Sequence, residues 1–271
     1  MHLYQTVRES TLYGLCEILP ISYSGHRYLS QLLAQPSPLT QAPQDGALEG
    51  IVSAGVALAA GVLARNRLAR LLVEGVQAIA RPSLFRTTPG GRDAAVLLLA
   101  APISLTLQIL SEPILAPWTG SPIAVGAGLF VTGSLLATLA IAPRSYRDQP
   151  SLPTAIALGT VAGASIYPGA ARMAAMLVLL LQLGYKPAYA LDLALLLSLP
   201  SLIFIFLRTV MHNGTGGIDI GMGVLGCLLS FLAAMLGCAL LKALLSRRLV
   251  PLLALWLIPL GFSVLAYGRA L

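Results

Sequence analysis

Charged residues are scarce in this chain of 271 residues. Asp, Glu, Lys and Arg together make up only 10% of it, whereas apolar residues make up 57%. An ordinary soluble domain carries about 25% charged residues, and the mean hydropathy here is +0.83. A soluble protein of this length could not cover its surface with so few charges. The composition therefore excludes a soluble globular protein and predicts an integral membrane protein built of several apolar helices.

Cysteine is also rare. The three cysteines, Cys16, Cys227 and Cys238, lie far apart within apolar stretches and form no Cys-x-x-Cys pair. This spacing argues against a zinc-ligand motif and against a disulfide framework. We expect these residues to act as small apolar fillers between helices.

Acidic residues are outnumbered, with 10 Asp and Glu against 17 Lys and Arg, which gives a formal net charge of +7. A basic balance can indicate nucleic-acid binding. Here, however, the basic residues lie in short loops between apolar runs, as is typical of the cytoplasmic loops of membrane proteins. We therefore expect a bilayer around the protein and no nucleic-acid partner.

Six apolar runs are long enough to cross a bilayer, which takes about 17–25 residues of helix. They are residues 47–64, 94–110, 123–142, 190–207, 220–241 and 250–267. Two further apolar segments, 11–33 and 152–183, are interrupted, the first by Pro20 and the second by Pro168-Gly169. The predicted fold class is an all-α polytopic membrane protein, with residues 1–271 in a single membrane domain.

The loop charges predict how the segments cross the membrane. Basic residues are concentrated in 65–92 and follow the third and fifth runs, which places these loops in the cytoplasm. This assignment is consistent only if segment 152–183 enters and leaves on one side, as a re-entrant hairpin. Residues 151–271 then repeat residues 1–142 with inverted topology, and the broken helices of such folds meet near the midplane. We expect 68–92 to form a cytoplasmic amphipathic helix followed by a turn.

The first broken segment is unusually rich in polar groups for an apolar region. Pro20 ends a helix, and Gly25 lets the backbone turn and approach a ligand closely. The hydroxyls between them can cap a second half-helix, whose exposed N–H groups favour an anion. Capping alone, or a satisfied interfacial histidine, would explain single members of the cluster, but a buried carboxylate without a task is costly. The candidate site residues are Glu17, Ser22, Tyr23, Ser24 and His26.

The second broken segment carries one arginine, Arg172, four residues after Pro168 in an otherwise apolar run. A long basic side chain can reach the membrane interface by snorkelling. At the tip of a hairpin near the midplane Arg172 would lie too deep for that. Its planar guanidinium suits phosphate oxygens, so we interpret Arg172 as an anion clamp.

Two further acids, Glu49 and Asp192, each lie near the start of an apolar run. A carboxylate in that position stabilises the helix dipole. For Asp192 this explanation is preferred, whereas for Glu49 a role in the site is an equal alternative.

Residues 17–26 resemble the first signature of the undecaprenyl pyrophosphate phosphatase family, the bacitracin-resistance type. That signature has two acids four apart, then Pro, Ser-Ser-Thr, Gly and His. Residues 167–172 resemble its second signature, Pro-Gly-x-Ser-Arg-Ser-Gly followed by Thr, and the spans with Glu49 and Asp192 resemble those that follow each signature. The matches occur in order over nearly the whole chain. The resemblance implies six spans and two re-entrant helices in the plasma (inner) membrane of a bacterium.

Several signature positions are substituted in this chain. Tyr13 replaces the first acid, Tyr23 replaces the second serine, and hydroxyls of the second signature are lost to Ala171, Met173 and Met176. The retained signature residues are Glu17, Ser22, Gly25, His26, Pro168, Gly169 and Arg172.

The resemblance implies hydrolysis of undecaprenyl diphosphate, the spent carrier lipid of cell-wall synthesis, to undecaprenyl phosphate and inorganic phosphate. Arg172 would stabilise the phosphoryl oxygens, His26 would be the general acid or base, and Ser24, Ser22 or a water would be the nucleophile. Residues implied to contact the substrate are Tyr23, Gly25, Pro168, Gly169 and Arg172.

A divalent cation, Mg²⁺ or Ca²⁺, is implied as the cofactor. In the family two acids hold the metal, and in this chain Glu17 would hold it with help from Glu49.

A different function on the same scaffold stays open. An inverted repeat suits alternating access, and anion binding needs Arg172 but no nucleophile. The chain could therefore be a polyprenyl-phosphate lipid transporter or flippase, or a lipid-binding pseudoenzyme. The joint presence of Glu17 and His26 favours the phosphatase, and either function has a polyprenyl diphosphate lipid as its partner. The sequence leaves a homodimer open.

Overall fold

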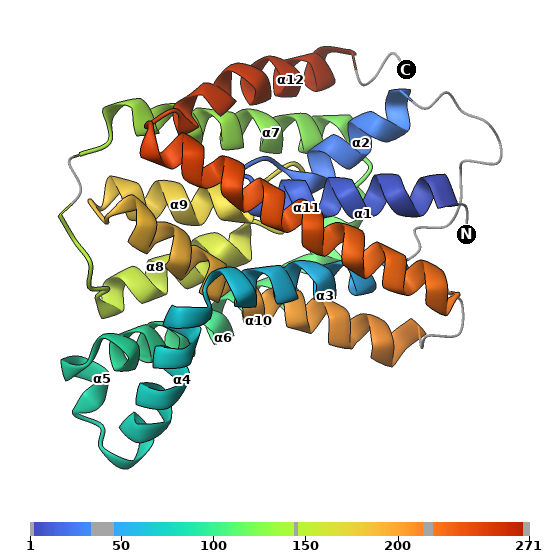
Figure 1. Cartoon of the computed structure of the whole chain (residues 1–271). Coiled ribbons are helices and arrows are strands. Elements are labelled where there is room, and N and C mark those ends of the chain that lie inside the picture. Colours follow the sequence, from blue (N-terminus) through green and yellow to red (C-terminus); the bar gives the residue numbers. More distant parts are fainter. Residues whose placement is uncertain (1–2, 34–45, 144–145, 214–218, 268–271) are drawn as a thin grey trace.

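The computed structural model describes residues 3–33, 46–143, 146–213 and 219–267 (Figure 1). Within these ranges the chain is helical, with a single isolated bridge between Arg147 and Tyr185 and no strand. The predicted all-α fold class is therefore confirmed.

Twelve α-helices make up the described part of the chain, with three 3-10 turns at Ala116–Trp118, Thr138–Ile141 and Val250–Leu253. The α-helices are α1 (Leu3–Ile18), α2 (Tyr23–Leu33), α3 (Gly46–Leu63), α4 (Arg65–Ala80), α5 (Leu84–Thr87), α6 (Pro89–Leu115), α7 (Pro122–Ala137), α8 (Leu152–Ala164), α9 (Arg172–Gln182), α10 (Pro187–Asn213), α11 (Ile220–Ser246) and α12 (Ala254–Tyr267).

Four of the longer helices begin at a side chain that caps the first turn. Thr88, Ser121, Ser151 and Asp219 each accept a hydrogen bond from a backbone N–H at the start of α6, α7, α8 and α11. The first three are followed by a proline within two residues, where the missing N–H costs nothing. These local signals explain why the apolar runs begin where they do.

Four of the described helices, α6, α7, α10 and α11, are long and apolar enough to cross a membrane. The pair α3 and α4 passes the same test as a fifth span, but it is bent by 82° at Ala64. Helix α11 also exposes a continuous apolar stripe suited to lipid, formed by Val224, Leu228, Leu232 and Leu236. The chain is a multi-pass membrane protein.

The two broken segments form hairpins of short helices (Figure 1). Helices α1 and α2 enter from one end of the bundle, and α8 and α9 enter from the opposite end, so that both tips lie in its middle. Pro20 lies in the break between α1 and α2, and Pro168-Gly169 lies in the break between α8 and α9. Gly169 has a φ of +81°, in the left-handed region that favours glycine.

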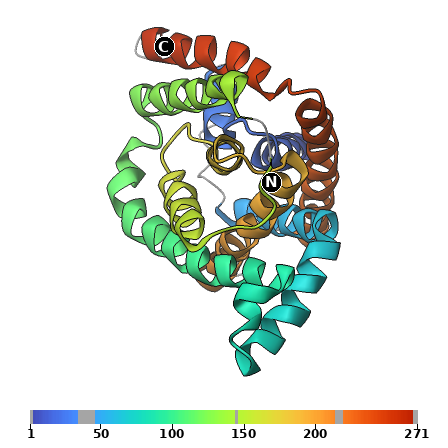
Figure 2. The ribbon, with the colours of Figure 1, turned by 90° about the vertical axis from the view of Figure 1, so that its left-hand side faces the viewer.

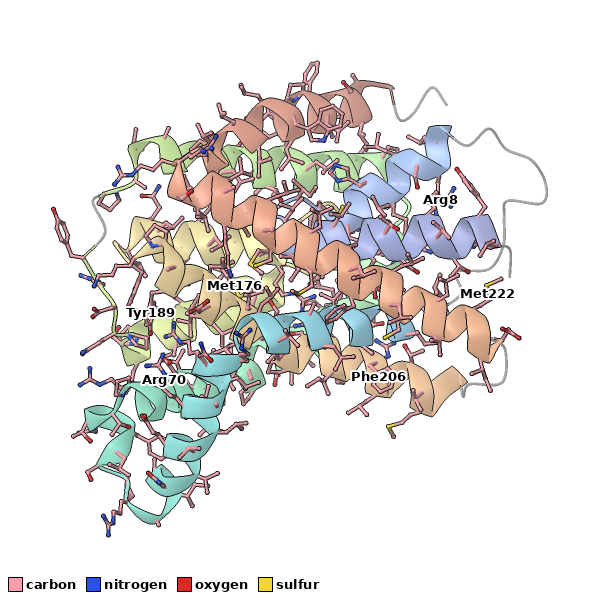
Figure 3. All side chains as sticks on the ribbon, viewed as in Figure 1. Arg8, Arg70, Met176, Tyr189, Phe206 and Met222 are labelled. Atoms are coloured by element: carbon pink, nitrogen blue, oxygen red, sulfur yellow. The ribbon has the colours of Figure 1, made fainter. Side chains whose placement is uncertain are left out.

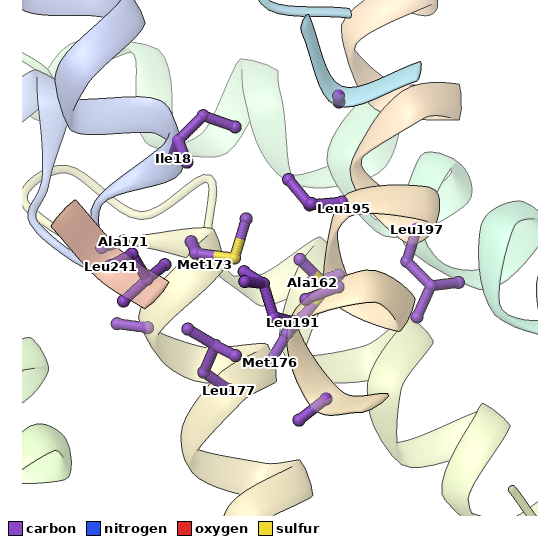
Figure 4. Packing of buried hydrophobic residues seen from close by; sticks show 14 of the residues in the cluster. Ile18, Ala162, Ala171, Met173, Met176, Leu177, Leu191, Leu195, Leu197 and Leu241 are labelled. Carbon is purple, nitrogen blue, oxygen red and sulfur yellow. The ribbon is translucent and has the colours of Figure 1, made fainter. Parts of the chain in front are cut away.

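The hairpins are enclosed by the longer helices. Helix α1 packs along α11, α8 along α6, α3 against α10 and α11, and α7 along α12. Viewed along the bundle, α9 lies inside a ring of the other helices (Figure 2). Its buried side chains include Met173, Met176 and Leu177, and they pack with Leu191 of α10 and with Ile18 at the end of α1 (Figure 4).

The two ends of the bundle contain different helix ends. The α3–α4 junction, the start of α8 and the end of α11 lie at one end, and the starts of α1 and α11 lie at the other (Figure 1). Arg70 and Tyr189 accordingly lie at the first end, and Arg8 and Met222 at the second (Figure 3). The helix expected within 68–92 is α4, which is followed by a turn and the short α5.

Candidate functional site

The tips of the two hairpins are joined by two polar contacts. The backbone N–H of Gly169 donates a hydrogen bond to Ser24 Oγ at 2.9 Å. Arg172 Nη2 donates to Glu17 Oε1 at 2.8 Å, across 155 residues of sequence. The two broken segments therefore build one site in which each hairpin supplies a charged and a backbone or hydroxyl partner.

The first tip is shaped by its serines. Ser22 is fully buried, and its Oγ accepts a hydrogen bond from Gly25 N at 3.1 Å, so Ser22 caps α2. Ser24 Oγ lies 3.1 Å from Ser22 Oγ and is exposed toward the second tip. Of the two hydroxyls, Ser22 is buried in the cap of α2, whereas Ser24 is exposed and bridges the two tips.

The backbone of the second tip approaches α7 closely at Gly128. A Cβ added at Gly128 would collide with the carbonyl oxygen of Pro168, and one added at Gly169 would collide with that of Val125. Thr132 Oγ1 also donates to the carbonyl oxygen of Gly169 at 3.4 Å. The backbone of the second tip is therefore fixed by close approach to α7, and the approach explains why both positions are glycine.

A cavity of about 620 Å³ lies beside the joined tips. Its volume is within the range of small-molecule sites. Five of the residues predicted from the sequence line it, namely Glu17, Tyr23, Ser24, Glu49 and Arg172. The opposite wall comes from α6 and α10 and includes Gln108, Glu112, Phe204 and Arg208.

Arg172 lines this cavity and has a donor without a partner among the described residues. Its side chain and that of Glu17 are each only 13% exposed. Nη2 is bonded to Glu17, whereas Nη1 is buried without a hydrogen-bond partner among the described residues. An unsatisfied buried donor on a cation is costly unless a ligand accepts from it. Arg172 is also the first residue of α9, whose N-cap Ala171 provides no side-chain cap, so the orphan N–H groups of that helix also favour an anion.

His26 is not among the residues that line the cavity. Its Nδ1 lies 2.7 Å from the carbonyl oxygen of Ser22, one turn earlier in the chain. Its Nε2 accepts a hydrogen bond from Trp256 Nε1 at 3.1 Å. Because the indole can only donate, the ring is assigned as neutral with its proton on Nδ1. The imidazole therefore supports the Ser22 turn from behind.

Two acids could hold a divalent cation at the cavity. Glu17 is paired with Arg172, and Glu49 Oε2 lies 3.9 Å from Arg27 Nη1. Among the described residues no group of three His, Cys, Asp or Glu side chains is arranged to bind a metal ion. Mg²⁺ often needs only one or two carboxylates, with phosphate and water as its other ligands. The donor set fits such a substrate-bridged cation and does not fit a protein-only metal cage.

Glu9 is a site neighbour that sequence reasoning missed. It is buried, and its Oε1 accepts hydrogen bonds from Arg8 Nε and Nη2 at 3.2 and 2.7 Å. Its Oε2 accepts from the Tyr23 phenol at 3.3 Å and lies 3.7 Å from Arg27 Nε. Glu9 precedes Glu17 by eight residues, so the two side chains lie on the same face of α1. That spacing was the signal that could have found it.

The Tyr23 ring is held in place by this network. It packs edge-on against Tyr13 with ring centroids 4.7 Å apart, and the Arg27 guanidinium lies 6.0 Å from its centroid. Its hydroxyl is bonded to Glu9, so the phenol is engaged away from Ser24. The two tyrosines that replace signature residues are therefore packed together.

An ion pair on the opposite wall of the cavity was also missed by sequence reasoning. Arg208 of α10 forms an ion pair with Glu112 of α6. Beside it Gln108 Nε2 donates to Ser104 Oγ and to Ser201 Oγ, both at 2.9 Å. The polar groups of this wall lie on the two long helices α6 and α10. These segments were interpreted only as apolar runs long enough to cross a membrane, so the polar residues within them were not singled out.

Comparison with known proteins shows the family of the chain. The chain is 25% identical over 270 residues to an undecaprenyl-diphosphatase of Korarchaeum cryptofilum, covering 98% of this chain and 99% of the relative. It is 29% identical over 254 residues to one of Chromohalobacter salexigens, covering 91% and 92%. It is 26% identical over 219 residues to one of Salinibacter ruber, covering 78% and 79%. The family model described as bacitracin resistance protein BacA matches residues 10–263, and the chain therefore belongs to that family.

Proposed function

We propose that this protein is an integral membrane phosphatase that hydrolyses undecaprenyl diphosphate to undecaprenyl phosphate and inorganic phosphate. The family and the names of the relatives described above support this activity. The observation that carries the proposal is Arg172, a buried guanidinium that lines the cavity, with Nη2 paired to Glu17 and Nη1 without a hydrogen-bond partner among the described residues. The transport alternative is not favoured, because the relatives carry the diphosphatase name.

The diphosphate is proposed to bind between the two tips. Its terminal phosphate would accept hydrogen bonds from Arg172 Nη1 and from the first N–H groups of α9. The lipid chain would leave the cavity along the apolar surface of the bundle. This placement uses the groups that have no partner within the described residues, and it brings phosphorus next to Ser24.

Ser24 is proposed as the hydroxyl that attacks phosphorus or holds the attacking water. In-line phosphoryl transfer depends mainly on positioning and on charge stabilisation. Ser22 is buried and caps α2, and the Tyr23 hydroxyl is bonded to Glu9, so neither is free to attack. His26 is a positioning residue, since it reaches Ser24 only through the Ser22 turn.

The remaining signature residues would act through the backbone. A Cβ at Gly25 would enter the space of Leu129, and Pro168 with Gly169 forms the turn that rests on α7. These positions bring the hairpin tips close enough to share one phosphate.

A divalent cation, Mg²⁺ or Ca²⁺, would be held by Glu17 and Glu49 together with diphosphate oxygens. When bound, it would neutralise charge on the phosphates as the bridging bond breaks. Glu17 in this arrangement would both orient Arg172 and face the ligand.

The finer topology is likewise proposed as six spans with two re-entrant hairpins, in inverted repeats of residues 1–142 and 151–271. The packing supports it, because α1 packs along α11 as its repeat mate α8 packs along α6. The pairs α3 with α10 and α7 with α12 each join an element to its own repeat mate. The proposed location is the plasma (inner) membrane of a bacterium.

The purified protein, reconstituted in liposomes containing undecaprenyl diphosphate, tests the activity. We expect release of inorganic phosphate and formation of undecaprenyl phosphate in equal amounts, with Mg²⁺ or Ca²⁺ present. A chelator should lower the rate if Glu17 and Glu49 hold a cation. If substrate crosses the bilayer unhydrolysed under every metal condition, the transport function replaces the phosphatase.

A further inference from the structure

Helix α4 carries an apolar face that no other part of the described chain covers. Its exposed apolar residues are Leu72, Val73, Val76 and Ile79, which are between 55% and 75% exposed. Their spacing places them on one side of the helix. We call these four residues the α4 stripe.

The opposite face of α4 is locked to the bundle, which fixes the direction of the stripe. Arg67 Nε and Nη2 donate to the two oxygens of Asp93 on α6 at 2.6 and 2.7 Å, and both side chains are buried. Arg67 Nη1 also donates to the carbonyl oxygen of Tyr189 on α10, and its guanidinium lies 3.8 Å from the centre of the Tyr189 ring. A bidentate pair that is also stacked cannot turn without breaking, so α4 cannot roll its stripe inward.

A second contact joins α4 to the start of α6. Glu74 Oε2 accepts hydrogen bonds from Gly90 N and Gly91 N at the start of α6, at 2.6 and 3.3 Å. A Cβ at Gly90 would lie 2.5 Å from the carbonyl oxygen of Arg70, so the two helices approach closely there. Helix α4 is thus a fixed part of the fold.

The orientation of α4 matches the surface of a membrane. The bend of 82° after α3 turns the chain from the direction of a span to nearly across it. Figures 1 and 2 show α4 projecting sideways from the bundle, with α5 and the start of α6 along one side of it. An apolar helix face in this position lies at the level where the spans leave the bilayer.

Basic residues accompany the stripe. Arg70 is exposed on the flank of α4 next to it, and Gln77 lies on the same flank. Arg81 is exposed just after the last residue of α4. An apolar stripe beside arginines is the pattern of a helix that lies in the interface and binds anionic headgroups.

We propose that α4 is an interfacial helix, with its stripe inserted in the cytoplasmic leaflet and Arg70 and Arg81 bound to anionic phospholipid headgroups. The bilayer is the occupant because α4 continues directly from α3, the apolar helix before it, and because its charges complement anionic lipid. The inference does not depend on the phosphatase activity.

Site-specific labelling measures the depth of the stripe. In a background with the three cysteines replaced by alanine, V76C places a fluorophore on the stripe, and Q77C places it on the polar flank as the matched control. The full-length protein is reconstituted in vesicles of phosphatidylcholine with phosphatidylglycerol. We expect doxyl-lipid quenchers to quench the V76C label at least threefold more than the Q77C label, and aqueous iodide to show the reverse order.

Two results would overturn the proposal. One is a V76C label as open to iodide as the Q77C label. The other is a V76C label shielded from both quenchers, with shielding that falls as the protein is diluted in lipid, since a second copy of the chain would then cover the stripe.

A separate experiment tests whether the two arginines bind anionic headgroups. The R70Q/R81Q variant should lose doxyl quenching of the V76C label in vesicles with phosphatidylglycerol, down to the value in phosphatidylcholine alone. If the V76C label is quenched equally with and without the R70Q/R81Q substitutions, the role of the arginines is overturned. Unchanged thermal unfolding of each labelled protein shows that the fold is intact, and phosphate release is scored separately.

Discussion

Substitutions of the ion pair between Glu17 and Arg172 distinguish a structural from a catalytic role more sharply than substitutions elsewhere in the site. The two side chains are each 13% exposed and meet at 2.8 Å. Removing one partner of a buried pair leaves an uncompensated charge and costs about 3–5 kcal/mol. For a chain of this size, where 1 kcal/mol shifts Tm by about 2–4 °C, Glu17→Gln should lower Tm by roughly 6–20 °C.

The E17Q/R172Q double variant removes both charges. Because neither charge is then left buried alone, most of the lost Tm should return. Phosphate release from undecaprenyl diphosphate should not return, since each single variant loses an oriented group worth on the order of a hundredfold or more. Thermal unfolding in detergent and phosphate release per folded molecule measure the two effects.

A matched control comes from the buried pair of Arg67 and Asp93, at one end of the bundle. Asp93→Asn breaks the pair with Arg67 and should cost a similar Tm, yet leave the rate per folded molecule within a few-fold of the wild type. The reasoning is refuted if the E17Q/R172Q variant recovers activity along with stability. It is refuted equally if Arg172→Gln alone keeps the wild-type rate.

Further outcomes follow for the hairpin tips. Ser24→Ala should lower phosphate release on the order of a hundredfold and cost about 1 kcal/mol of stability through the lost bond to Gly169. Ser22→Ala should cost about 1 kcal/mol through the lost cap and keep the rate per folded molecule within several-fold; the reverse pattern of rates would exchange their roles. Tyr23→Phe and Tyr23→Ser should both keep the rate within several-fold, because the phenol is bonded to Glu9, and loss of turnover in the Phe variant alone would make Tyr23 the nucleophile. Gly169→Ala should lower both Tm and activity, since a left-handed φ costs alanine roughly 1–2 kcal/mol and its Cβ would meet α7.

The apolar helices α6, α7, α10 and α11 could be predicted from the sequence because each contains a long apolar run. The breaks were also predictable, since Pro20 and Pro168-Gly169 interrupt such runs. Arg172 was predicted as a clamp from its isolation among apolar residues. Its pairing with Glu17 was not predicted, because nothing local connects residues that are 155 positions apart.

Side-chain direction was the part that sequence could not supply. The resemblance implied that His26 is the general acid or base, but its ring is bonded to the carbonyl oxygen of Ser22 and to Trp256, which lies 230 residues away. Arg67 was counted only as one of the basic residues of 65–92, and Asp93 was not singled out, whereas the two side chains are buried against each other. Tertiary packing decides both outcomes, and neither leaves a periodic signal.

A structure of the protein with a methylene diphosphonate analogue of undecaprenyl diphosphate tests the central claim most directly. The account predicts that the terminal phosphonate lies between the hairpin tips, within hydrogen-bond distance of Arg172 Nη1 and next to Ser24 Oγ. An analogue bound elsewhere, with Arg172 Nη1 still unpartnered, would contradict it.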